Sequence, residues 1–168
     1  MKFIWLLRKI CLFLPSKWLE TLALREQPHP LALRETGIRI VSFSFETNQE
    51  FQFQQDEIWE ALKLLQKYAP LQMKRITEHI SIICIRTTGG YRGSYLKTGK
   101  FCALNLSSFS KGTAKTRQIT IAGILVHEAT HGKIEEMKIP YCGSTVNRIE
   151  KICIKEQSKT TEKLANLI

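Results

Sequence analysis

Several residue types that commonly build functional sites are scarce in this sequence of 168 residues. Aspartate occurs once, at Asp56, so carboxylate chemistry elsewhere in the chain depends on glutamate. Histidine occurs four times, and no histidine follows His131. None of the five cysteines forms a Cys-x-x-Cys pair, which excludes a zinc ribbon and a thioredoxin-type motif. Their wide spacing is typical of a reduced, intracellular protein.

A long apolar run is also absent near the N-terminus, where Arg8 and Lys9 break the most apolar stretch. Residues 1–14 are too few to span a bilayer, and no small-x-small cleavage site of a signal peptide follows them. We expect residues 1–15 to form an amphipathic helix. Two roles remain open for it: contact with an anionic membrane surface through residues 1–14, or docking on the rest of the domain. The expected location is cytoplasmic, with peripheral membrane contact under the first alternative.

Positive charge is in excess, because 25 Lys and Arg residues against 15 Asp and Glu residues give a net charge of +10. Basic proteins of this kind bind nucleic acid, anionic membranes or acidic substrates. Here the basic residues are spread along the whole chain, without a long consecutive run. This distribution favours a general surface property, and we do not expect nucleic acid as a partner.

Hydrophobic patterning predicts a single α+β domain over residues 16–168. The length and the 43% hydrophobic content are sufficient for one compact core. The expected elements are strands at 38–45, 80–85 and 101–106, helices at 54–68, 71–79, 119–131 and 146–167, and loops at 89–93, 107–118 and 137–145. The strands are expected to form a small mixed sheet.

The most informative motif is His127-Glu128-Ala129-Thr130-His131, which has the pattern His-Glu-x-x-His and follows an apolar run over residues 119–126. Residues four apart lie on one face of a helix, so His127 and His131 can bind one zinc ion. Glu128 can then hold and deprotonate a water molecule at the metal. A surface helix that carried these residues by chance would not need an apolar run directly before them. The motif therefore predicts a Zn²⁺ site.

Catalytic zinc takes three protein ligands and keeps a fourth position open. Because neither His nor Asp occurs downstream of the motif, a carboxylate third ligand must be a glutamate. Glu150, in the first turns of the last expected helix, is the first choice, and Glu156 is the alternative. The residues that share the face of Glu150 are Cys153, Ile154, Gln157 and Leu164. This face is mostly apolar and is expected to point inward, whereas a solvated glutamate would pair with neighbouring lysines.

This pattern of a His-Glu-x-x-His helix, a loop and a helix bearing Glu150 resembles the gluzincin arrangement of thermolysin-like zinc metallopeptidases. The stretch from Val126 to Cys153 is also similar to small single-domain zincin-like proteins, and the resemblance covers residues 80–160. It implies a zincin-type fold in which a second metal-ligand helix follows the active-site helix. It further implies a strand along the cleft that holds a peptide substrate, a role expected here for Phe101–Leu106.

The resemblance implies a zinc metallopeptidase, a hydrolase acting on a peptide or protein, with Glu128 as the general base. Tyr141, in the loop between the two metal-ligand helices, is the first choice as hydrogen-bond donor to the developing oxyanion. Tyr91, Tyr95 and Arg148 are the alternatives for that donor. The alternative function is a non-catalytic zinc-binding regulatory or membrane-associated protein that keeps the zincin fold. Glu128 favours the enzyme, because a purely structural metal site does not need a base.

Overall fold

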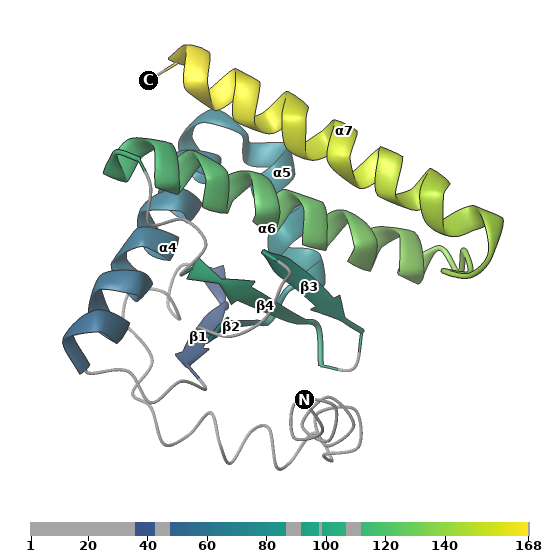
Figure 1. Cartoon of the computed structure of the whole chain (residues 1–168), viewed down its shortest axis with the longest axis horizontal. Coiled ribbons are helices and arrows are strands. Elements are labelled where there is room, and N and C mark those ends of the chain that lie inside the picture. Colours follow the sequence, from purple (N-terminus) through teal and green to yellow (C-terminus); the bar gives the residue numbers. More distant parts are fainter. Residues whose placement is uncertain (1–35, 43–47, 87–91, 98, 107–111, 168) are drawn as a thin grey trace.

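The computed structural model describes residues 36–42, 48–86, 92–97, 99–106 and 112–167, and the helix expected at residues 1–15 lies outside them. Eight elements follow one another in this part of the chain (Figure 1). They are β1 (Arg39–Ser42), α4 (Asn48–Tyr68), α5 (Pro70–His79), β2 (Ile82–Arg86), β3 (Gly93–Leu96), β4 (Phe101–Asn105), α6 (Ala114–Glu136) and α7 (Ser144–Leu167).

The four strands form one sheet in the order β1-β2-β4-β3. β1, β2 and β4 are parallel, whereas β3 runs antiparallel to β4. The connection from β1 to β2 contains both α4 and α5, as a parallel pair requires a long crossover. The expected α+β class with a small mixed sheet is confirmed.

Several element boundaries differ from the sequence-based expectation. α4 begins at Asn48, six residues before the expected start at Gln54. β2 begins two residues late because Ile80 caps α5, donating its backbone N–H to the carbonyl of Ile76. α6 begins at Ala114, inside the expected loop, because the Thr113 hydroxyl accepts a hydrogen bond from the backbone N–H of Thr116 at 3.2 Å and caps the helix.

β3 was not predicted from the sequence, because this short strand begins with Gly93 at the end of a glycine-rich stretch. Its presence changes the role expected for Phe101–Leu106. β4 (Phe101–Asn105) is fully buried and is paired with β2 on one edge and β3 on the other. A strand paired on both edges has no edge left for a substrate, so the role expected for this segment was wrong. Among the described strands, β3 forms the edge of the sheet on this side.

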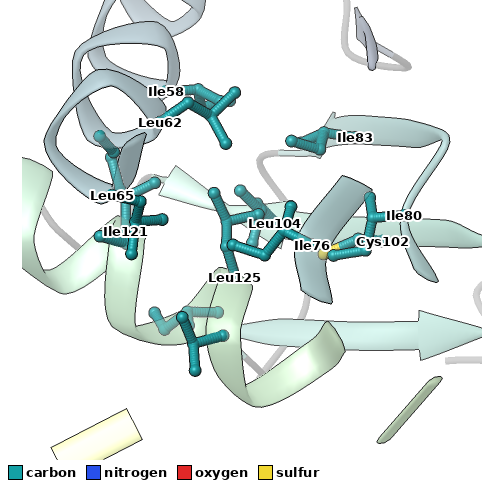
Figure 2. Packing of buried hydrophobic residues seen from close by; sticks show 14 of the residues in the cluster. Ile58, Leu62, Leu65, Ile76, Ile80, Ile83, Cys102, Leu104, Ile121 and Leu125 are labelled. Atoms are coloured by element: carbon teal, nitrogen blue, oxygen red, sulfur yellow. The ribbon is translucent and has the colours of Figure 1, made fainter. Parts of the chain in front are cut away.

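The main core lies between the sheet and the helices α4, α5 and α6 (Figure 2). Its largest side chains are almost completely inaccessible, and most are branched aliphatic residues. They include Ile58, Leu62, Leu65, Ile76, Ile80, Ile83, Leu104, Ile121 and Leu125. Each such side chain contributes about 1.5–3 kcal/mol on burial, so this core holds α6 firmly against the sheet.

α6 and α7 pack against each other along their length (Figure 1). α6 is therefore covered on several sides, and all of its residues 121–126 are buried. Gly123 permits the close approach of α7: a Cβ atom at this position would lie 2.4 Å from Cγ2 of Thr161. No helix in the described ranges is both long and apolar enough to cross a membrane.

Candidate metal centre

α6 presents His127 and His131 one helical turn apart, next to the N-terminal half of α7. The two imidazole rings are mostly buried, and their Nε2 atoms lie 3.1 Å apart. Their ring centroids are separated by 4.9 Å. The apolar residues that precede the motif anchor this part of α6 in the core, which places the polar motif at the rim of that core.

Glu150 on α7 completes a triangle with the two histidines. Its Oε2 atom lies 3.5 Å from Nε2 of His127, and its Oε1 atom lies 3.3 Å from Nε2 of His131. Ligand atoms of a tetrahedral zinc ion with bond lengths of about 2.0–2.2 Å are separated by about 3.3–3.6 Å. The three separations at this site are close to those values and involve both carboxylate oxygens of Glu150, so His127, His131 and Glu150 lie close enough together to bind one metal ion.

The structure holds Glu156, the alternative ligand, in a different contact. Arg75 from α5 donates hydrogen bonds to Oε2 of Glu156 at 2.8 Å and to Oγ1 of Thr130 at 3.0 Å. These contacts join α5, α6 and α7, and both charged side chains are largely shielded from solvent. The position of Glu156 therefore indicates a structural ion pair, and Glu150 is the carboxylate beside the imidazoles.

Cys153 is a residue of this site that the sequence analysis assigned only to the core. It is completely buried, and its Sγ atom lies within 4.8 Å of the ligating nitrogen atoms of His127 and His131. The group His127, His131 and Cys153 can hold a metal ion. Burial, followed by the nearby charges of Glu150 and Glu128, raises the pKa of the Cys153 thiol to about 12.

Gln157 lies one helical turn beyond Cys153 and orients the first histidine. Its Oε1 atom lies 3.1 Å from Nδ1 of His127. Because an amide oxygen can only accept, Nδ1 of His127 carries the hydrogen, and in the neutral ring Nε2 keeps its lone pair. A second hydrogen bond of this kind is characteristic of metal-bound histidines. The sequence analysis placed Gln157 on the inward face but gave it no function, and it misjudged Ile154 of the same face, which is exposed.

The environment of both imidazoles favours their neutral form. Burial lowers the pKa of His127 below its usual value, against the opposing effects of the Glu150 charge and the Gln157 hydrogen bond. Burial also lowers the pKa of His131, and the neighbouring His127 adds to this effect, while Glu150 again opposes it. Neutral imidazoles are the form that binds a metal ion, so this environment favours the form of both rings that a metal site would need.

Tyr141 lies in the loop between α6 and α7, beside the carboxylate of Glu150. Its hydroxyl donates a hydrogen bond of 2.6 Å to Oε1 of Glu150, and its ring packs edge-on against His131. This hydrogen bond to Glu150 is the main reason why the pKa of Tyr141 is raised to about 12. The loop is held by Thr145, whose hydroxyl bonds the carbonyl groups of Pro140 and Cys142. Tyr141 therefore orients Glu150 in this structure.

Glu128, the motif glutamate, is 5% exposed and lies between α6 and the edge strand β3. A Cβ atom on Gly93 would lie 2.5 Å from Oε1 of Glu128 and 2.7 Å from Cγ2 of Ile124. Only glycine lets the β3 backbone approach the carboxylate this closely. The first residue of β3, which the sequence analysis placed in a loop, is thus part of the wall around Glu128.

A cleft of about 960 Å³ opens over these residues. It is lined by β3 with the adjoining Lys97, by α6, and by residues 138–141 with the start of α7. Glu128 and the triangle of His127, His131 and Glu150 all line it. Of the other expected oxyanion donors, Tyr95 also lines the cleft, Arg148 is exposed on α7 and Tyr91 lies outside the described residues.

Comparisons of the chain with protein-family models, curated proteins and solved structures find no significant match.

Proposed function

We propose that the protein is a zinc-dependent peptide hydrolase of the gluzincin type. The observation that carries this proposal is the group of His127, His131 and Glu150, whose donor atoms are separated by 3.1–3.5 Å, in the same cleft as the buried Glu128. A zinc ion bound there would lower the pKa of water towards about 7 and would polarise a substrate carbonyl. The nitrogen and oxygen donor set is one that zinc accepts in catalytic sites.

Glu128 is the group in the cleft that can act as general base. Its buried carboxylate lies between the motif helix and β3 and lines the same cleft as His127 and His131. It would accept a proton from that water as the carbon–oxygen bond forms, and then deliver the proton to the leaving amine nitrogen as the peptide bond breaks. The apolar wall formed by Ile134, Ile139 and Ile149 would limit the access of bulk water.

The edge strand β3 is suited to hold an extended substrate. The backbone N–H of Asn105 bonds the carbonyl of Arg92, so pairing alternates along β3 and its Gly93 and Tyr95 backbone groups face away from β4. A peptide in the cleft would pair with these groups, as an added strand does at a sheet edge. Gly93 lies against Glu128, so this pairing would bring a peptide bond to the base.

Tyr141 has two roles in this proposal, and they apply to different stages. Its hydroxyl holds Oε1 of Glu150 before a substrate binds. It could donate to an oxyanion in the cleft only after it leaves this carboxylate, and 56% of the residue is exposed, so movement of the ring is sterically open. The assignment of Tyr141 as oxyanion donor stays a prediction.

The experiment is hydrolysis of a peptide library by the zinc-loaded protein and by Glu128→Gln, read by mass spectrometry. We expect cleavage by the wild type and at least about a hundredfold less by Glu128→Gln, because the amide cannot accept the proton. Glu135→Gln is the matched control, because Glu135 lines the same cleft but pairs with Lys97. Equal cleavage by Glu128→Gln and wild type, with zinc bound in both, would refute the proposed mechanism.

A further inference from the structure

Cys153 brings a fourth donor to a site that already has three. Glu150 and Cys153 are three residues apart on α7 and therefore project from the same face of that helix. The carboxylate of Glu150 contacts both imidazoles, and the sulfur of Cys153 lies within 4.8 Å of a ring nitrogen of each histidine. Two imidazoles, a carboxylate and a thiol thus lie close together between α6 and α7.

The four side chains lie close enough together for a metal site with four protein ligands and no position left for water. In a tetrahedral zinc site with a Zn–S bond of about 2.3 Å, sulfur and nitrogen ligands are separated by about 3.6 Å. A shift of about 1 Å, within the reach of one χ1 adjustment or a small movement of α7, would bring the sulfur to that separation. Cys153 packs with Ile134 and Ile149 in a small apolar cluster, so its side chain is held between α6 and α7 beside the histidines.

We propose that Cys153 closes this metal site and keeps the protein in a latent state. This inference rests on the proposed function, because latency has a meaning only for a metal site that can catalyse. The sulfur would become the fourth ligand at the position that catalysis needs for water. The S–H bond breaks, its proton goes to solvent, and a sulfur–metal bond forms, without oxidation or reduction. Turnover would then require Cys153 to leave the metal.

The other cysteines of the described chain do not share this position. Cys84 and Cys102 are buried on strands of the sheet, and Cys142 is exposed in the loop before α7. Zinc sites with four protein ligands are the closed, structural kind, whereas catalytic sites keep one position open. The removal of a single sulfur atom would therefore convert one kind of site into the other. Replacement of Cys153 therefore tests whether its sulfur keeps the site closed.

The test uses the full-length protein loaded with Co²⁺, whose absorption spectrum reports thiolate ligation. We expect the wild type to show a thiolate-to-cobalt charge-transfer band in the near ultraviolet. Cys153→Ala should bind cobalt without this band, and Cys142→Ala should keep it. Cys153→Ser, which is nearly isosteric, should also lose the band, and circular dichroism checks that each variant is folded. If the sulfur of Cys153 occupies the fourth metal position in nine tenths of the wild-type molecules, only one tenth can cleave a peptide. Zinc-loaded Cys153→Ala should then cleave peptides about tenfold faster than wild type.

Two outcomes separate this inference from the function on which it rests. Wild-type protein that binds cobalt without the charge-transfer band would overturn closure by Cys153 and leave the site of two histidines and Glu150 intact. Wild-type protein that binds no cobalt would overturn both the metal centre and its closure. Peptide cleavage that is unchanged or slower in folded, metal-loaded Cys153→Ala would contradict latency even if the band is present.

Discussion

The Nδ1–H group of His127 donates a hydrogen bond to Oε1 of Gln157, 3.1 Å away across the contact between α6 and α7. This single contact leaves Nε2 of His127 to face His131 and Glu150. It also couples the motif helix to the helix that carries Glu150, so the geometry of the site depends on the packing of both helices.

Replacement of Gln157 by leucine should weaken zinc binding about 10- to 100-fold, the usual cost of losing a hydrogen bond behind a metal ligand. Leucine has a similar size but cannot accept the Nδ1 hydrogen, so the imidazole loses its fixed orientation. Competition with a chromophoric chelator measures the affinity. Ser158→Ala, an exposed neighbour on α7, is the control and should bind zinc as the wild type does. Wild-type affinity in Gln157→Leu would remove Gln157 from the site.

Gly93→Ala should reduce kcat/KM about a hundredfold while zinc remains bound, because displacement of a catalytic group by about 1 Å has an effect of this size. The added Cβ would lie 2.5 Å from Oε1 of Glu128, so either the carboxylate or β3 must move. Peptide cleavage and zinc content are measured together.

Gly123→Ala provides the contrast to this variant. Its Cβ would lie 2.4 Å from Thr161 and 3.2 Å from Gln157, so it would push α7 away from α6. We expect Gly123→Ala to lose zinc affinity, in contrast to Gly93→Ala. Normal cleavage by Gly93→Ala would show that Glu128 does not depend on the close approach of β3.

The metal-free protein should become less stable as the pH falls below about 6.5. Burial lowers the pKa of His79, His127 and His131, so below their usual value the unfolded chain takes up protons that the folded chain does not. The contribution of the three neutral imidazoles to the free energy of unfolding is therefore fully present above about pH 6.5. It is lost as the pH falls towards the pKa values of the folded protein. The slope is at most about 1.4 kcal/mol per pH unit for each imidazole.

Urea denaturation at a series of pH values measures this slope. His79→Gln removes one of the three titrating groups and should flatten the dependence below about pH 6.5. His79 is suited to this test because it lies on α5, next to Glu136, and is not one of the proposed zinc ligands. A metal-free protein that gains stability on acidification would contradict the assignment of neutral, buried imidazoles.

The sequence predicted those parts of the site that depend on local periodicity. The spacing of His127 and His131 determined that both lie on one face of α6, and the apolar face of α7 placed Glu150 beside them. The proximity of Cys153 and Gln157 to the histidines was not predicted, although both share that face, because a sequence does not show which residues of one helix lie against the histidines of another.

Features that depend on tertiary approach could not be predicted. β3 is only four residues long and starts with a glycine, and its pairing with β4 fixes it as the edge strand. Gly93 is needed there because of Glu128, which is 35 residues away in the sequence. The engagement of Glu156 by Arg75 likewise depends on how α5 packs against α6, within reach of α7. No local pattern contains this information.

The most direct test of the account is the zinc content of the purified protein, reconstituted with zinc and freed of loosely bound metal, beside His127→Ala and His79→Gln. The account predicts about one zinc ion per chain in the wild type and in His79→Gln, and almost none in His127→Ala. Absence of zinc from the wild type, or an unchanged zinc content in folded His127→Ala, would contradict a metal centre built on α6 and α7.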